Sequence, residues 1–215
     1  MAINKEKYSA IINTLPKNVT LVAVSKTKPI EDIQALYDLG QRDFGENYVQ
    51  ELVEKEAALP KDIRWHFIGH LQSNKAKFIA PFVHLIHGVD SESLLKEINK
   101  QAKKNNRTID CLLQVHIATE ETKFGFDKHE LEQLHGLHEL ENINIKGLMG
   151  MASFSDDLNL VRTEFKKLKN LYDQLNPQFS ILSMGMSGDY HIAIEEGSTM
   201  IRIGSLLFGE RNYNK

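Results

Sequence analysis

Apolar, strand-like runs recur along the whole chain. The first, residues 20–26, is nearly continuous Leu, Val and Ala, which is typical of a strand buried on both faces of a parallel sheet. Seven more runs of this kind cover residues 43–46, 64–69, 83–89, 110–117, 143–151, 179–186 and 200–204. The pattern therefore predicts eight strands.

Helical patterns separate these runs, because apolar residues recur there three and four positions apart. The longest pattern extends from Leu158 to Leu175, and Asp127 with Glu130 forms a capping box that predicts another helix start. A polar–apolar segment at residues 5–15 is expected to form a leading helix before the first strand.

Alternating strands and helices indicate an α/β protein with a parallel sheet. Eight units favour a closed (β/α)8 barrel of the TIM type, preceded by an N-terminal helix, over an open doubly wound sheet. The open sheet stays possible, because this pattern does not reveal strand order. No Pro-, Gly- or Ser-rich linker interrupts the chain, so residues 1–215 are expected to form one domain.

Composition and charge indicate which kinds of partner and metal site this protein is not expected to have. The net charge of -3 disfavours a nucleic-acid or acidic membrane surface as the main partner. The polar N-terminus lacks the apolar core of a signal peptide, and no run approaches the roughly 18 apolar residues of a membrane span. One cysteine, Cys111, leaves no disulfide framework and no cysteine-rich metal site. We expect a cytoplasmic protein that binds neither nucleic acid, membrane nor metal.

The function of a barrel belongs at the carboxyl ends of its strands, and Lys26 stands at the end of the first run. Burial there would disfavour the ammonium and lower its pKa, which allows a lysine to form an imine with an aldehyde. The alternative is that Lys26 extends from the strand end into water.

The last two runs end in small residues. Ser187, Gly204 and Ser205 are expected to form a phosphate cradle, because barrels bind phosphate at the loops after strands seven and eight. Ordinary tight turns are the alternative. Arg202 points to the same side of its strand as Gly204 and is a candidate partner for a ring nitrogen, or else an arginine at the surface.

An imine-forming lysine beside a phosphate cradle points to pyridoxal 5'-phosphate (PLP), which has both an aldehyde and a phosphate. Four motifs, AVSKTK (23–28), FGENYVQE (44–51), WHFIGHLQSNK (65–75) and LSMGMS (182–187), followed by RIG (202–204), closely resemble the YggS/PROSC family of pyridoxal phosphate homeostasis proteins. The resemblance spans nearly the whole chain. It implies a fold-type III barrel, like the N-terminal domain of alanine racemase without its C-terminal domain.

The resemblance also implies roles for particular residues. The Schiff-base lysine corresponds to Lys26, the ring-nitrogen partner to Arg202, and a residue of the pocket wall to Asn47. The phosphate contacts correspond to the three cradle residues named above, and Met149, near the end of the sixth run, completes the expected cofactor-binding set. The chain departs from the family pattern at His116 and at residues 147–152.

Three functions remain open at this stage. The leading one is a carrier that buffers PLP, contributes to intracellular vitamin B6 homeostasis and supplies apo-enzymes, without catalytic residues of its own, as a monomer or weak homodimer. The second is a PLP-dependent enzyme acting on amino acids, such as a racemase. The third is a barrel isomerase or aldolase that forms an imine with a phosphorylated sugar.

Overall fold

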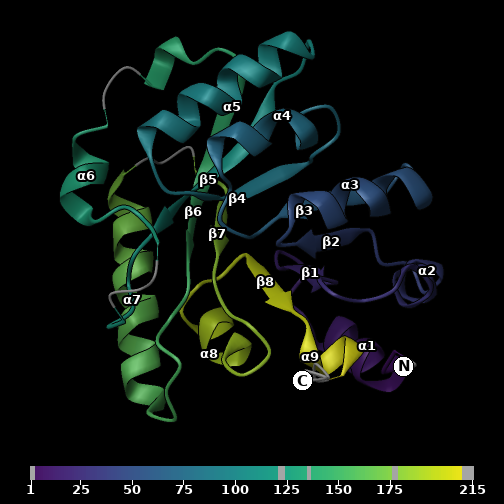
Figure 1. Ribbon diagram of the computed structural model, residues 1–215. Helices are drawn as coiled ribbons and strands as arrows, with labels where there is room; N and C mark the ends of the chain where they lie inside the picture. Colours follow the sequence, from purple (N-terminus) through teal and green to yellow (C-terminus); the bar gives the residue numbers. More distant parts are fainter. Residues whose placement is uncertain (1–2, 121–123, 135–136, 176–178, 210–215) are drawn as a thin grey trace.

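Eight parallel strands close into a barrel in their order along the chain, and β8 pairs with β1 (Figure 1). The structure is a computed structural model that describes residues 3–120, 124–134, 137–175 and 179–209. Its strands are β1 Thr20–Val24, β2 Asp43–Glu46, β3 Arg64–Phe67, β4 Leu85–Val89, β5 Ile109–Val115, β6 Ile143–Gly150, β7 Ile181–Ser183 and β8 Met200–Ile203. The closed barrel confirms the predicted fold and excludes the open sheet.

Helices surround the strands on the outside of the barrel (Figure 1). They are α1 Lys5–Thr14, α2 Ile30–Asp38, α3 Val49–Ala58, α4 Ala76–Ile79, α5 Glu92–Lys104, α6 Lys128–Glu132, α7 Leu158–Leu175, α8 Tyr190–Glu195 and α9 Ser205–Phe208. The leading helix is confirmed as α1, and the capping box of Asp127 and Glu130 starts α6 as expected.

Most strands end earlier than the hydrophobic pattern predicts. β1 stops at Val24 rather than at residue 26, and β7 covers three residues instead of eight. The apolar character continues past the last strand hydrogen bonds because the loops at the barrel mouth are themselves partly buried. Lys26 and Ser187 therefore stand in loops just beyond their strands.

Two kinds of core fill the molecule. The larger lies mainly between the strands and the helices, where the buried faces of α5 and α7 pack. A small apolar cluster is separate from it and contains Val22, Leu85, Leu112, Met149 and Met200. These residues come from β1, β4, β5, β6 and β8, which places them in the barrel interior. The polar side chains that share this interior lead to the site described below.

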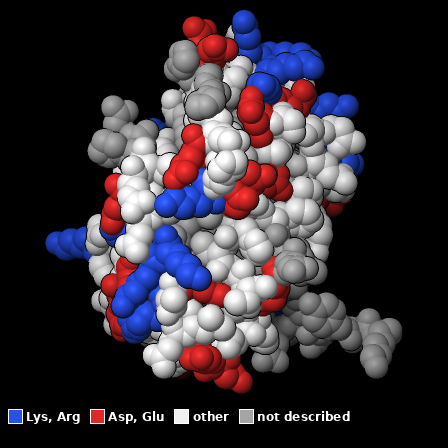
Figure 2. Space-filling view, turned by 90° about the vertical axis from the view of Figure 1, so that its left-hand side faces the viewer, with Lys and Arg blue, Asp and Glu red and all other residues white. Residues whose placement is uncertain are grey.

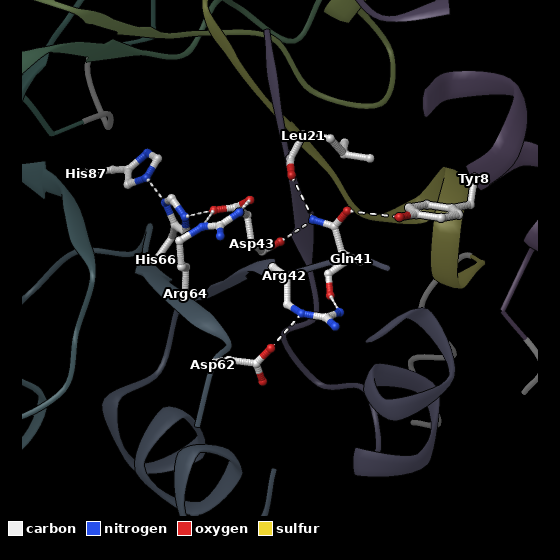
Figure 3. A network of polar contacts seen from close by, with 9 residues as sticks. All are labelled: Tyr8, Leu21, Gln41, Arg42, Asp43, Asp62, Arg64, His66 and His87. Atoms are coloured by element: carbon white, nitrogen blue, oxygen red, sulfur yellow. Dashed lines mark hydrogen bonds and ion pairs between the residues drawn. The ribbon is translucent and has the colours of Figure 1, made fainter. Parts of the chain in front are cut away.

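Polar contacts from its N-cap residue and from a tyrosine side chain hold the helix α1 against the rest of the molecule. The Asn4 backbone N–H donates to the Leu207 carbonyl (2.8 Å), and α1 and α9 lie side by side in Figure 1. The Tyr8 hydroxyl donates to Gln41 (3.3 Å), whose amide donates to the Leu21 carbonyl (2.8 Å), as Figure 3 shows. The N-terminal helix is thus part of the barrel's support.

Charges of both signs are interspersed on the face of the molecule that carries α7 (Figure 2). Within α7, Lys169 forms an ion pair with Asp173, and Arg162 of α7 forms an ion pair with Glu195 at the end of α8. Among the helices that the structure describes, none has both the length and the apolar character needed to cross a membrane.

Candidate functional site

A cavity of about 580 Å³ opens at the carboxyl ends of the strands. Its volume lies within the roughly 300–1,000 Å³ of small-molecule sites. Six of the seven residues predicted to bind a cofactor line it: Lys26, Asn47, Ser187, Arg202, Gly204 and Ser205. These residues come from chain segments up to 179 positions apart (205 minus 26), and the barrel brings them together.

Met149 is the expected residue that does not line the cavity. It is buried in the apolar cluster with Val22 and Leu85, one layer deeper in the barrel. Met151 lines the cavity in its place, because residues two apart on a strand point to the same side. The register between β5 and β6 also shifts between Cys111 and Leu112, and the sequence pattern gives no sign of this shift.

A buried ammonium fixes the loop before Lys26. The Lys55 Nζ on α3 donates to the Ser25 carbonyl (2.7 Å), to the Glu46 carboxylate (2.7 Å) and to the Glu51 carboxylate (2.6 Å). The Ser25 hydroxyl donates to the same Glu46 oxygen (2.6 Å). This cluster was not predicted, because Lys55 and Glu51 on α3 resemble an exposed helix face, and no local pattern places them beside Glu46 on β2.

The loop after Lys26 is held from the same helix. The Thr27 backbone N–H donates to Glu51 (2.6 Å), and Thr27 has a φ of 63°, in the left-handed region that β-branched residues rarely adopt. Such strain persists only where surrounding contacts impose it. Both neighbours of Lys26 are therefore fixed, which limits where its half-buried side chain can reach.

The carboxyl group of Glu46 titrates in an unusual range. Burial raises its pKa to about 7, although Lys55 and the Ser25 hydroxyl favour the charged form. Its Oε2 is buried and, within the described residues, has no hydrogen-bond partner, so the cost of burial is only partly offset. The support under Lys26 thus contains a group that changes its charge near neutral pH.

A second lysine, Lys28, also lines the cavity. Its Nζ donates to the carbonyls of Phe208 (2.9 Å) and Gly209 (3.2 Å) at the end of α9. A cation at a helix C-terminus satisfies carbonyls that have no partner within the helix. Lys28 therefore has a structural role that ties the loop of Lys26 to α9.

The predicted phosphate cradle is assembled from two loops. The Gly204 backbone N–H donates to the Ser187 hydroxyl oxygen (3.2 Å), and α9 begins at Ser205. A hydroxyl and the first N–H groups of a helix are donors of the kind that bind phosphate oxygens. The residues present fit an anionic group at this side of the cavity.

Arg202 is buried, with 4% of its surface exposed, and lines the cavity floor. Its Nη1 donates to the Ser183 hydroxyl (2.6 Å), and its Nη2 donates to the Gly150 carbonyl (3.0 Å). Burial lowers the pKa of the guanidinium to about 10, which leaves it charged at neutral pH. The alternative of a surface arginine is wrong.

Asn47 contributes a buried polar atom at the cavity wall. Its Oδ1 has no hydrogen-bond partner within the residues that the structure describes. Gly69 allows this close approach of β2 and β3, because a Cβ on Gly69 would lie 2.4 Å from the Asn47 carbonyl oxygen. A buried amide oxygen without a partner fits a site that a polar ligand completes.

The two departures from the family pattern occupy different positions. The His116 Nε2 lies 2.9 Å from the Glu120 carbonyl, and His116 is outside the cavity lining. Residues 147–152 supply the Gly150 carbonyl that fixes Arg202 and the Met151 side chain in the cavity wall. The second departure therefore reaches the site.

Comparisons with known proteins agree with this geometry. The family described as "Alanine racemase, N-terminal domain" matches residues 4–212. A pyridoxal phosphate homeostasis protein of Aquifex aeolicus (strain VF5) is 45% identical over 199 residues, which cover 90% of this chain and 87% of that protein.

Solved structures agree as well. PipY of Synechococcus elongatus PCC7942, determined with PLP bound, is 37% identical with a TM-score of 0.87, and the match covers 95% of this chain and 99% of that chain. An alanine racemase of Clostridium difficile 630 has a TM-score of 0.79 at 15% identity and covers 98% of this chain and 57% of that chain. At this identity the second likeness shows the fold alone.

Proposed function

This chain belongs to the alanine racemase N-terminal domain family and, within it, to the pyridoxal phosphate homeostasis proteins, and we propose on that basis that it binds, carries and buffers PLP. One observation of the structure carries the proposal. A lysine, a hydroxyl with helix-start N–H groups and a buried arginine surround one cavity at the carboxyl end of the barrel.

Each residue matches a different part of the cofactor. When bound, the cofactor supplies an aldehyde carbon to which an amine can bond. Lys26 is the proposed covalent attachment point, and Ser187, Gly204 and Ser205 receive the phosphate. Arg202 faces the ring nitrogen, where a cation disfavours protonation, and Asn47 offers its unpartnered amide oxygen to the remaining polar edge.

The cavity wall also supports a carrier rather than an enzyme. Its titratable residues, among those that the structure describes, are Lys26, Lys28, Asp189 and Arg202. The Lys28 ammonium donates hydrogen bonds to two carbonyls, and the Asp189 carboxylate accepts a hydrogen bond from the Met186 backbone N–H (2.5 Å). Amino-acid chemistry on PLP needs an acid or base placed opposite the lysine, and neither group has the freedom for this.

We further propose that apo-enzymes that need PLP receive it from this protein. Among the residues that the structure describes, the half-buried Lys26 and the fully exposed Phe154 at the cavity rim are accessible to a recipient. A monomeric or weakly dimeric state and a cytoplasmic location stay predictions.

Absorbance and isotope exchange together test the proposal. Adding PLP should give a band near the visible edge that borohydride removes, and no band should form with Lys26→Ala. Deuterium exchange at the Cα of alanine and other amino acids in heavy water should not exceed that of the Lys26→Ala control. Lys26-dependent exchange at about one per second, an ordinary enzymatic rate, would instead establish the racemase-like enzyme.

A further inference from the structure

A continuous chain of hydrogen bonds crosses the barrel interior beneath the cavity. Asp43 Oδ1 lies 3.0 Å from His66 Nε2, and His66 Nδ1 lies 2.9 Å from His87 Nε2. His87 Nδ1 lies 3.1 Å from the Ser183 hydroxyl, which accepts from Arg202 at 2.6 Å. All five side chains are buried, and Figure 3 shows the part from Asp43 to His87.

The two ends of this chain have fixed hydrogen-bond roles. The guanidinium of Arg202 can only donate. Burial alone would raise the pKa of Asp43, but hydrogen bonds from His66 and Arg64 outweigh burial and lower it to about 2. Asp43 is therefore a carboxylate that can only accept, and Arg64 Nε donates to it at 2.7 Å.

Because one end can only donate and the other can only accept, the hydrogen bonds of Ser183, His87 and His66 between them run in one direction. Ser183 accepts from Arg202, so its hydroxyl proton can be donated to His87 Nδ1. His87 then donates from Nε2 to His66 Nδ1, and His66 donates from Nε2 to Asp43. In the opposite direction the Ser183 proton would have no acceptor among these partners, and a buried unpaired donor is costly.

Burial independently favours this arrangement. Desolvation lowers the pKa of His87 well below its usual value, and the charge of Arg202 lowers it further, so the imidazole is neutral. A neutral imidazole has one donor and one acceptor nitrogen, as the chain requires.

We propose that Ser183 and His87 are positioning residues, which hold the Arg202 guanidinium toward the cofactor's ring nitrogen through a one-directional chain that ends at Asp43. The inference rests on the proposed binding of PLP. It assigns a role to interior residues on β3, β4 and β7 that do not line the cavity. Both histidines are neutral, with the proton on Nε2.

The reason for such support lies in the freedom of arginine. Its long side chain adopts many conformations, and a buried guanidinium is costly where its donors lack acceptors. Ser183 and the Gly150 carbonyl bind different nitrogens of Arg202 and so fix the plane of the group. Without Ser183, one of these two constraints is lost, together with the donor to His87.

Cofactor binding by Ser183→Ala tests the proposal. The dissociation constants of PLP and of its analogue with carbon in place of the ring nitrogen are compared for wild type and variant. PLP should bind the variant about threefold to tenfold more weakly, the loss expected for one hydrogen bond, while the analogue should bind both alike. In an Arg202→Lys background, Ser183→Ala should have no further effect.

The matched control is His84→Gln. The His84 ring packs 5.4 Å from that of His66, but among the described contacts it forms no bond in the chain. This variant should bind PLP as wild type does. Equal weakening of PLP and the analogue in Ser183→Ala would show a merely structural role, and unchanged PLP binding would also overturn the proposal.

Nitrogen NMR measures the protonation of the histidine ring nitrogens in the wild-type protein itself, so this test does not depend on the folding of a variant. His66 and His87 should each show a protonated Nε2 and a bare Nδ1 at pH 7. A charged ring, or a proton on Nδ1 of either residue, would contradict the one-directional chain. If the wild type itself fails to give a borohydride-sensitive band with PLP, the proposed function fails, whatever the tautomers are.

Discussion

At the scale of residues, two lysines two positions apart face the same cavity from different surroundings. Lys28 donates to two carbonyl oxygens at the end of α9 and holds that helix. Lys26 is half-buried between two residues whose backbones are fixed by α3. A fixed backbone reduces the freedom that a side chain loses when it bonds to a ligand. The surroundings thus favour Lys26 as the residue that reacts.

The phosphate contacts give the first prediction. Ser187→Ala removes a hydroxyl at the Gly204 side of the cavity, and a hydrogen bond to a charged group contributes roughly 1.5–3 kcal/mol. PLP affinity, measured by absorbance titration, should therefore fall about tenfold to a hundredfold. Pyridoxal, which lacks the phosphate, should bind wild type and variant equally poorly. Undiminished PLP affinity would mean that the phosphate binds elsewhere.

Glu46 predicts a pH dependence of stability. Its pKa of about 7 in the folded protein exceeds the ordinary 4.5, so between these values the folded state binds more protons than the unfolded state. The free energy of unfolding should then fall as pH rises from 4.5 to 7, by up to about 3 kcal/mol, and level off above. Urea unfolding at pH 5 and 8 measures this difference. Glu46→Gln should lack this contribution, and the same fall in both proteins would refute it.

At the scale of elements, α3 supports the site although none of its residues lines the cavity. Its lysine reaches under β1 and β2 and joins the Ser25 carbonyl to two carboxylates. The helix therefore links the positions of two strand ends, and a displacement of α3 is expected to move the Lys26 loop.

Removing this lysine tests the role of α3. Lys55→Met leaves Glu46 buried without its cation, and breaking a buried ion pair typically costs about 3–5 kcal/mol of unfolding free energy. Lys61→Met is the matched control, because Lys61 pairs with Glu56 at the surface and exposed pairs contribute less than about 1 kcal/mol. Urea unfolding compares the two, and PLP attachment should weaken only in Lys55→Met. Equal stability losses would argue against the buried tether.

At the scale of the whole molecule, barrel closure creates the site. β8 pairs with β1, so Arg202, Gly204 and Lys26 come together although they belong to opposite ends of the chain. The sequence predicts that these residues come together, because each of them stands at or just after the carboxyl end of an apolar run. Strand number, the leading helix and the closed barrel follow from the same alternation.

Other parts of the site depend on contacts that no local pattern contains. Met149 falls one layer too deep because depth depends on strand register, which shifts between β5 and β6. The buried role of Lys55 depends on where α3 packs. The bond between His87 and Ser183 joins residues 96 positions apart on strands that are not neighbours in the sheet. Closure of the barrel brings this last pair together.

The location of the covalent bond distinguishes Lys26 from every other lysine as the attachment point for PLP. The protein is mixed with PLP, reduced with borohydride, digested and mapped by mass spectrometry. We expect one reduced adduct, on Lys26, and none in Lys26→Ala, whose circular dichroism should match that of the wild type. An adduct on Lys28 or another lysine, or an adduct that persists in Lys26→Ala, would contradict it.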